Sequence, residues 1–424
     1  MKIGVVHDWL PLYGGAEHVV SAIMQTVGPA DLYTIFDFLS IEDRKRIGAD
    51  HIITSYLNRL PLCQNYYRWT FPFCPTAIES FDLSEYDLVL SSSAAFAKGV
   101  IVHPHQHHIA YVHSSIRYAW DQTFEYMDRT PLSRGLSGAL LRLVLHNLRM
   151  WDTRTANGPD VLIANSTTVQ RRIEQVYGRF AIVLPPPVDN VEFPMCSDKD
   201  DYFVVASRLV SYKRIDLIVD AFKEMPSRRL VVLGDGPEMK RLKLHAGPNV
   251  MIKGHVSRKE LVDVVSHAKA FIFASYEDFG IVMAEAQAAG TPVLAFQRGG
   301  ALDIVRTSKT ECPTGMFFAE QSTGAIKDVV ERFIVQQSFF TPQACSENAR
   351  RFSIENFCSR LTEIIDVTLD PYFNRDLRIL PATNFPTAGP RTAEPRRLYL
   401  GDRNRRPTQA SGHGDARTYN YSSD

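Results

Sequence analysis

The chain has 424 residues, of which 45% are hydrophobic and 22% are charged. This length exceeds what one ordinary core needs, so it indicates two domains with additional segments. Basic and acidic residues number 47 each, which gives a formal net charge of zero. A nucleic-acid-binding protein would normally show a basic excess, and no nucleic-acid partner is therefore expected.

Cysteine usage and hydrophobic run lengths indicate the compartment. The six cysteines form no C-x-x-C pair and none lies beside a histidine at zinc-ligand spacing, so they are typical of thiols in a reducing compartment. The apolar run at residues 1–10 is too short for a signal peptide and is interrupted by Asp8. The sequence contains no uninterrupted run of about 18 apolar residues, so no membrane span is predicted. We expect a cytoplasmic protein, or one docked peripherally on the cytoplasmic face of the inner membrane.

Short apolar runs alternate with amphipathic segments, which is the pattern of parallel α/β domains. Most runs end in Gly, Ser, His or Asp, and such strand ends are where α/β enzymes hold their ligands. In chain order, the expected strands are 2–7, 31–36, 87–92, 108–113 and 161–165, followed by 202–209, 229–234, 250–254, 270–275 and 292–296.

The two halves are expected to meet at residues 184–201, where three consecutive prolines predict a stiff extended segment. Asp198 and Asp200 form a D-x-D pair in this segment. The pair precedes a strand instead of following one, which favours a solvated linker over a metal site.

Beyond Pro371 the composition changes to Pro, Arg, Gly, Asn, Ser and Thr without apolar periodicity, which predicts disorder. Whether the last helix returns to the N-terminal domain is left open by the sequence. The predicted organisation is an N-terminal domain over 1–190, a C-terminal domain over 191–351, a helix over 352–370 and a disordered tail over 371–424.

The most specific motif is SYEDFGIVMAEAQAAGTPVLAFQRGG, residues 275–300. Gly280 and the amides after it open a predicted helix, whose unpaired N–H groups attract phosphate. Glu285 can accept hydrogen bonds from ribose hydroxyls, and Glu277 on the loop can accept one from a sugar. The alternative for Glu285 alone is a carboxylate that favours the dipole of its own helix.

A second motif, ASRLVSYKRIDLIVDAF at residues 206–222, places Arg208 at a strand end and Lys213 on the following loop. Two such cations can clamp a diphosphate, the arginine as a fork and the lysine as a point charge. The alternative is that both are ordinary surface charges. Arg214 is expected to face solvent.

In the first half, Gly14 and Gly15 follow the first strand and let the backbone approach a ligand closely, a simple strand-to-helix turn being the alternative. His113 ends a strand and is expected to face the cleft, although a strand-end histidine is often structural. Arg117 and Asp121 are expected to bind acceptor hydroxyls or each other.

The run EDFGIVMAEA, followed by the A-x-G-T-P-V-L-A pattern, resembles the donor site of family 4 glycosyltransferases. The resemblance runs from residue 1 to about 370. The segment YVHSSIRYAWD also resembles the Y-x-H-T-P-x-R-Y-x-W-D segment of bacterial members, with Ser114 and Ser115 replacing Thr-Pro. These are retaining enzymes, and the resemblance implies an α/β fold of the GT-B type, two Rossmann-like domains facing across a deep cleft.

The resemblance also implies residue roles. Catalytic roles fall to His113, Arg208, Lys213 and Glu277, and acceptor binding falls to Arg117 and Asp121. No metal or other cofactor is expected, because side-chain cations stabilise the leaving diphosphate. The implied nucleotide-sugar-binding residues are Gly14, Gly15, Gly236, His255, Val256, Phe279, Gly280, Ile281 and Glu285.

The implied activity is retaining transfer of a hexose to a glycan or lipid-linked oligosaccharide, as in the mannosyltransferases of surface-polysaccharide synthesis. GDP-mannose is the leading donor and UDP-sugars follow. The alternatives are a nucleotide-sugar epimerase of the same fold and a catalytically inactive GT-B binding module. Residues 56–73 and 133–154 mix apolar, aromatic and basic residues. For the second stretch a core-facing helix is favoured over an interfacial helix on anionic lipid.

Overall fold

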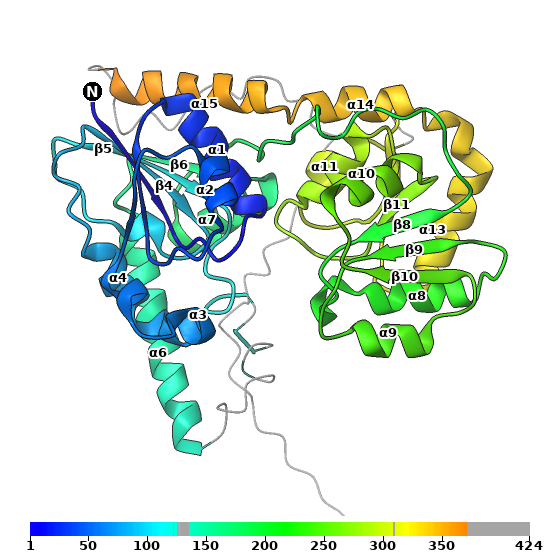
Figure 1. Cartoon of the computed structure of the whole chain (residues 1–424), viewed down its shortest axis with the longest axis horizontal. Coiled ribbons are helices and arrows are strands. Elements are labelled where there is room, and N and C mark those ends of the chain that lie inside the picture. The colour runs from blue at the N-terminus through cyan, green and yellow to red at the C-terminus, as the bar shows by residue number, and fades with distance from the viewer. Residues whose placement is uncertain (122, 125–126, 128–134, 308–309, 371–424) are drawn as a thin grey trace, which may run out of the picture. The chain divides into compact units, whose positions relative to one another are not determined.

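The computed structural model describes residues 1–121, 123–124, 127, 135–307 and 310–370. The expected disordered tail, residues 371–424, lies outside them. Within the described residues the chain forms two fully parallel sheets, each covered by helices (Figure 1). This arrangement matches the two Rossmann-like domains expected from the sequence.

The first sheet has seven strands in the order β3-β2-β1-β4-β5-β6-β7. Alternate side chains of β1 enter different cores: Val5 packs with helices α1 and α15, whereas Val6 packs with α4 and α6. Both faces of the sheet are therefore buried, as parallel sheets require. The strands are β1 (Ile3–His7), β2 (Asp31–Thr34), β3 (Ile52–Thr54), β4 (Leu88–Ser93), β5 (His107–Val112), β6 (Val161–Ala164) and β7 (Ile182–Val183).

The second sheet has six strands in the order β10-β9-β8-β11-β12-β13. In both sheets the strand order reverses beside the first strand of the domain, and such a switch point is where α/β sheets bind ligands. The strands are β8 (Phe203–Ala206), β9 (Leu230–Leu233), β10 (Val250–Gly254), β11 (Ala270–Phe273), β12 (Val293–Phe296) and β13 (Gly315–Phe318).

All ten expected strands are present, but most end earlier than predicted. The largest difference is the strand predicted over 202–209, which ends at Ala206 because the chain then turns into the loop that carries Arg208. Three further strands, β3, β7 and β13, were not predicted. β3 and β7 span three and two residues, too few for an alternating pattern to emerge, whereas β13 has four residues, as several predicted strands do.

The helices follow the strands in an alternating order. Several begin at a serine or threonine whose side chain accepts from a backbone amide three residues on, among them Ser166 before α7. The helices are α1 (Gly15–Val27), α2 (Ile41–Ile47), α3 (Cys63–Tyr66), α4 (Cys74–Glu79), α6 (Gly135–Thr155), α7 (Thr167–Tyr177), α8 (Ile215–Lys223), α9 (Met239–His245), α10 (Arg258–His267), α11 (Ile281–Ala288), α12 (Ala301–Ile304), α13 (Thr323–Gln336), α14 (Pro342–Arg350) and α15 (Ile354–Leu369), with 3₁₀ turns η1 (Tyr56–Arg59), η2 (Tyr67–Phe73), η3 (Ala97–Gly99), η5 (Ser211–Lys213) and η6 (Gln337–Phe339).

The chain crosses between the domains twice. At the first crossing the proline run 185–187 is buried, whereas Asp198 and Asp200 are exposed as a solvated linker requires. At the second, α14 packs on the C-terminal domain and α15 packs in the N-terminal core with α1 (Figure 1). The final helix therefore lies on the N-terminal domain.

Candidate functional site

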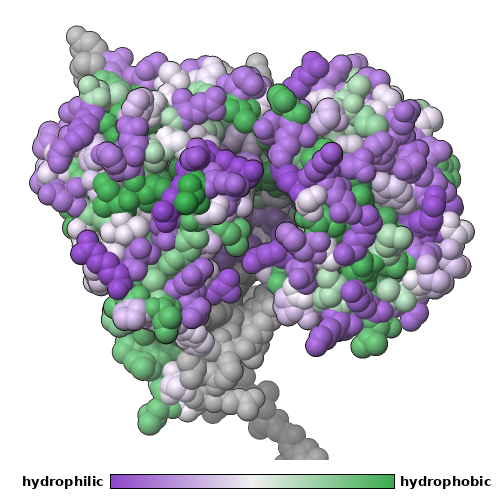
Figure 2. Space-filling view, in the orientation of Figure 1, coloured by the Kyte–Doolittle hydropathy of each residue, from purple (hydrophilic) through white to green (hydrophobic). Residues whose placement is uncertain are grey.

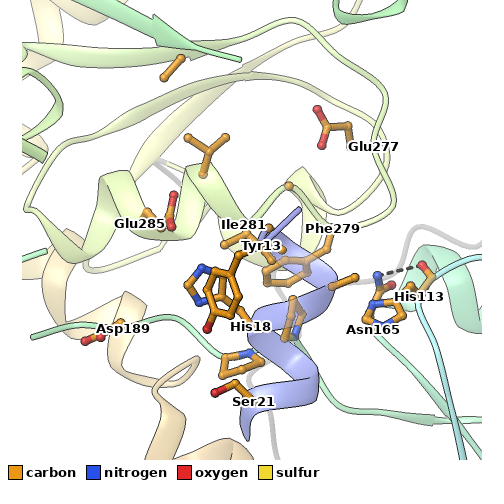
Figure 3. Close-up of a pocket in the computed structure, with 18 of the residues that line it drawn as sticks. Tyr13, His18, Ser21, His113, Asn165, Asp189, Glu277, Phe279, Ile281 and Glu285 are labelled. Atoms are coloured by element: carbon orange, nitrogen blue, oxygen red, sulfur yellow. Dashed lines mark hydrogen bonds between the residues drawn. The ribbon is translucent and has the colours of Figure 1, made fainter. Parts of the chain in front are cut away.

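A cavity of about 1400 Å³ is lined by residues of both domains. Single-ligand pockets are typically about 300–1,000 Å³, so this volume leaves room for two substrates. Figure 3 shows side chains from both domains converging on it. Eleven of the residues singled out from the sequence line this cavity: Gly14, Gly15, His113, Arg117, Arg208, Lys213, Glu277, Phe279, Gly280, Ile281 and Glu285.

The two cations of the C-terminal domain reach the cavity from the loop after β8. Arg208 is exposed, and its Nη2 donates to the Tyr212 hydroxyl at 3.0 Å. Lys213 ends η5, where its carbonyl accepts from Ser275 Oγ at 3.0 Å, and its ammonium contacts Glu277. Ser275 precedes Glu277 on the same loop, so this hydrogen bond fixes Lys213 beside that loop. A cation and a carboxylate therefore lie side by side at the cavity.

Helix α11 begins at this wall of the cavity. Its N-cap, Gly280, has φ of +88°, a left-handed conformation that favours glycine. Gly15 faces the same helix from the N-terminal domain, and a Cβ at Gly15 would lie 2.9 Å from Cδ1 of Ile281. Gly280 is thus favoured by its backbone conformation, whereas at Gly15 a side chain would require the end of Ile281 to move. As at any helix start, the first amides of α11 lack partners within the helix and can bind an anion.

Glu285 lies one turn into α11 and is ion-paired with Arg258, whose Nη2 is 2.7 Å from Glu285 Oε1. Arg258 also contacts both carboxylate oxygens of Glu192 and stacks over the Phe193 ring. Burial raises the pKa of Glu285, although Arg258 opposes this shift. Burial lowers the pKa of His18 on the opposite wall, and the Arg258 charge adds to the effect. Arg258 was not predicted from the sequence, although its position at the start of α10 was an available signal.

His113 forms part of the N-terminal wall. Its carbonyl accepts from Asn165 Nδ2 at 2.9 Å (Figure 3), and its ring Nε2 lies 2.8 Å from Ser92 Oγ. Burial lowers the pKa of His113 to about 3, and the charge of His7 adds to the effect. The imidazole is therefore neutral at physiological pH and can donate or accept a single hydrogen bond in the cavity.

Arg117 and Asp121 pair with each other at 3.5 Å, one of the two outcomes expected for them. Asp121 does not line the cavity, and it also contacts Arg172 at 3.4 Å. Arg172 in turn contacts Asp278 at 2.8 Å. Burial lowers the pKa of Arg172, but Asp278 and Asp121 outweigh burial and raise it. Arg172, which the sequence did not single out, therefore links the loop after β5 to the loop that carries Glu277.

Three residues implied for nucleotide binding lie outside the cavity lining: Gly236, His255 and Val256. A Cβ at Gly236 would lie 2.5 Å from the Leu209 carbonyl oxygen, so this glycine is explained by close backbone packing. His255 is exposed, and Val256 packs against the second hydrophobic core of the C-terminal domain.

Two further charged side chains have partners that the sequence did not indicate. Arg214 remains partly exposed to solvent, and its Nε lies 3.3 Å from Asp216 Oδ1. Asp303 had no assigned role, yet its carboxylate accepts from the backbone amide of Thr167 at 3.0 Å and from its hydroxyl at 2.7 Å. Asp303 therefore joins the C-terminal domain to the start of α7.

The described residues contain no group of three or more His, Cys, Asp or Glu side chains placed to hold a metal ion. They also contain no helix that is both long and apolar enough to cross a bilayer.

Residues 193–352 match the family model "Glycosyl transferases group 1", and so form a group 1 glycosyltransferase domain. Among curated proteins, the chain is 30% identical over 217 residues to the GDP-mannose-dependent alpha-(1-6)-phosphatidylinositol monomannoside mannosyltransferase of Mycobacterium tuberculosis, covering 43% of this chain and 55% of that protein. It is 32% identical over 119 residues to the GtfA subunit of a peptide N-acetylglucosaminyltransferase of Streptococcus parasanguinis, covering 26% of this chain and 23% of that one. The chain thus spans about half, or less, of these relatives.

Solved structures with the same architecture share little sequence with this chain. Sucrose-phosphate synthase from Thermosynechococcus elongatus superposes with a TM-score of 0.63 at 16% identity, covering 86% of this chain and 98% of that one. Anabaena HepE in complex with UDP-glucose superposes with a TM-score of 0.61 at 16% identity, covering 86% and 100%. These similarities show the fold, and the expected GT-B architecture is confirmed.

Proposed function

We propose that this chain, which carries a group 1 glycosyltransferase domain on a GT-B fold, transfers a hexosyl group from a nucleotide sugar to a glycan or lipid-linked oligosaccharide. The observation that carries the proposal is the convergence of Arg208, Lys213 and the first turn of α11 on one cavity. Each supplies positive potential where a departing diphosphate needs it, and such groups are often worth about 3–4 kcal/mol in the transition state.

The reaction breaks the bond between the anomeric carbon and a diphosphate oxygen, and forms a bond to an acceptor oxygen. The proton of the acceptor hydroxyl passes to the leaving phosphate oxygen. We propose attack from the face that the diphosphate leaves, with retention of configuration, and Glu277 and His113 hydrogen-bonded to the sugar. Nearby Arg172 and Asp303 contacts between the domains favour a closed cavity that limits hydrolysis.

GDP-mannose is the proposed donor. Its support is the 30% identity over 217 residues to a mannosyltransferase whose name specifies GDP-mannose. UDP-sugars are the second candidates, since HepE was solved with UDP-glucose on the same fold.

The proposal is tested by thermal unfolding of the protein with GDP, UDP, GDP-mannose and UDP-glucose, followed by turnover with the stabilising donor. A ligand that binds only the folded state raises the melting point, because at a hundredfold excess over Kd it adds about 2.7 kcal/mol to the free energy of unfolding. Release of nucleoside diphosphate that depends on an added acceptor supports transfer. Conversion of the free sugar nucleotide without acceptor would identify an epimerase, and binding without turnover would identify an inactive module.

We further propose peripheral docking on an anionic membrane through the apolar surface of α6 and residues 56–73. The helix favoured as core-facing buries Leu145 and Leu148 but exposes a second stripe along its length. Green side chains gather over this part of the molecule (Figure 2). The exposed apolar residues are Tyr56, Leu60, Leu62, Trp69, Phe73, Leu136, Leu140, Leu143 and Met150.

The charges around this surface suit an anionic bilayer. Arg59, Arg68 and Arg142 are exposed among the apolar residues. The acidic Asp152 is buried, and Glu79 is paired with Arg154 at 2.8 Å. A helix with an apolar face and flanking arginines binds at the headgroup level of anionic lipid.

Sedimentation with vesicles of phosphatidylcholine, with and without one-quarter phosphatidylglycerol, tests this surface. The triple variant Leu136→Ser, Leu140→Ser, Leu143→Ser is expected to weaken binding to anionic vesicles at least about tenfold. The control replaces Leu244 and Val335, which are as exposed but lie on the C-terminal domain, with serine. Equal loss in both variants, or no binding by the wild type, would remove the proposed docking.

A further inference from the structure

A chain of polar contacts runs beneath the N-terminal wall of the cavity. Ser92 Oγ on β4 lies 2.8 Å from Nε2 of His113 and 3.1 Å from Nδ1 of His7. On its other side, His7 Nε2 lies 3.8 Å from Oε1 of Glu17, and Glu17 Oε2 accepts from the Gly14 amide at 3.0 Å. The chain therefore begins and ends at residues that line the cavity, while its three inner members are buried.

The geometry fixes the proton of His7 and indicates an arrangement for the rest of this chain. His7 Nδ1 is 3.0 Å from the Ser92 carbonyl oxygen, which only accepts, so Nδ1 of His7 carries a hydrogen. The same N–H points at Ser92 Oγ, which leaves the serine hydroxyl hydrogen free to donate to His113 Nε2. An Nε2 that accepts requires the proton of a neutral imidazole to be on Nδ1.

His113 Nδ1 has no hydrogen-bond partner in the part of the chain that the structure describes, and His113 lines the cavity. Only a neutral imidazole has distinct tautomers, and the ring of His113 is kept neutral because burial and the charge of His7 lower the pKa of His113 to about 3. Burial opposes protonation of His7, but Glu17 and Asp8 outweigh burial and raise the pKa of His7.

We propose that Ser92 and His7 are positioning residues that hold His113 as the Nδ1–H tautomer, so that this N–H donates to an oxygen of the sugar nucleotide. Glu17 orients His7 from behind and ties the arrangement to the Gly14 loop. The role at the substrate rests on the proposed transferase function, whereas the tautomer itself does not.

The neighbouring residue offers a matched control. Ser91 Oγ lies 2.8 Å from Nε2 of His108, so β4 carries a second buried serine–histidine pair one residue away. His108 is buried and does not line the cavity. Loss of the Ser91 hydroxyl therefore removes an equivalent hydrogen bond without touching His113.

The first measurement is the ¹⁵N spectrum of the histidine rings in the full-length protein, which distinguishes the two tautomers and needs no turnover. We expect His113 as Nδ1–H in the wild type. Ser92→Ala should shift His113 toward the other tautomer, Ser92→Thr should keep it, and Ser91→Ala should leave it unchanged. Finding His113 as Nε2–H in the wild type would overturn the proposal, even if Ser92→Ala did not fold.

The second measurement is turnover with the donor and acceptor. Ser92→Ala is expected to lower kcat about 10- to 100-fold, as misplaced reacting groups do, with less than about a threefold change in donor KM. Ser91→Ala should stay within about twofold of the wild type. Equal kcat in Ser92→Ala and Ser91→Ala would overturn the positioning role. If the wild type showed no transfer at all, the proposed function would fail while the ring spectrum still decided the tautomer.

Discussion

Charged groups have different roles in the C-terminal wall of the cavity and in the interior of the N-terminal domain. On the C-terminal wall, Arg208, Lys213 and Glu277 come from two short segments and line the cavity themselves. On the N-terminal side, Lys98 and Asp152 are 2% and 0% exposed and contact each other below the surface. The first set is available to a ligand, whereas the second lies outside the cavity lining and joins elements within the N-terminal domain.

The buried pair is tied into its surroundings. Asp152 also accepts from Trp120 Nε1 at 2.7 Å and from the Tyr177 hydroxyl at 2.9 Å. It thereby joins α6, the loop after β5 and α7. Removing a group of this kind leaves an uncompensated buried charge, whereas removing a ligand-facing group leaves the fold intact. The difference teaches that substitutions in the buried pair should change stability, whereas substitutions in the C-terminal wall should change turnover.

The largest expected effect is on folding. Asp152→Ala should lower the free energy of unfolding by about 3–5 kcal/mol, because Lys98 remains buried without its partner. Urea unfolding followed by far-UV circular dichroism measures this change. Asp366→Ala, which removes an exposed carboxylate from α15, should stay within about 0.5 kcal/mol of the wild type. If Asp152→Ala were as stable as Asp366→Ala, the buried pair would not be needed for stability, and the contrast with the ligand-facing charges would be lost.

Lys213→Ala should act in the opposite sense. We expect kcat to fall about 10²- to 10³-fold because the departing diphosphate loses a preorganised cation. The unfolding free energy should change by less than about 1 kcal/mol, as for a partly exposed ion pair. Steady-state release of nucleoside diphosphate gives the rate, with exposed Lys240→Ala on α9 as the control. Wild-type turnover in Lys213→Ala would remove the clamp from the mechanism.

The sequence predicted the C-terminal wall because its parts are local. Arg208 and Lys213 are five residues apart, and Gly280 and Glu285 occupy one loop and helix, so a short motif contains their geometry. The implied Gly236, His255 and Val256 lie outside the cavity lining, because the loop after β9 and the end of β10 pack elsewhere.

The N-terminal wall was less predictable for a physical reason. His7 and Ser92 are separated by 85 residues and meet only because β1 pairs with β4. Strand order is a property of the whole sheet, so no local pattern at His7 contains its partner. For α6 the core-facing prediction describes Leu145 and Leu148, whereas its exposed stripe could not be assigned, since apolar helical spacing does not distinguish a buried stripe from an uncovered one.

His113→Ala probes the N-terminal wall where it reaches the ligand. We expect a folded protein with kcat about 10²-fold lower, because one hydrogen bond to the sugar is lost while the diphosphate clamp remains. The melting-point increase produced by GDP should be retained, in contrast to Lys213→Ala. Replacement of exposed His245 at the end of α9 with alanine is the control. Full activity in His113→Ala would make His113 structural.

The smallest expected effect concerns His108, a buried histidine of the N-terminal domain that is held as a neutral ring. Burial lowers the pKa of His108 to about 3, with a contribution from the charge of Arg179. The unfolded chain binds a proton at this position near pH 6.5 and the folded chain does not, so stability falls as pH drops below 6.5. Between pH 6 and pH 5 this single group should remove about 1.2 kcal/mol. His108→Gln should flatten the pH dependence of urea unfolding by that amount, whatever its effect on stability at pH 7. An unchanged pH dependence would mean that His108 takes up a proton in the folded protein as it does in the unfolded chain. This buried position would then accept a charge, as the cavity-lining C-terminal wall does.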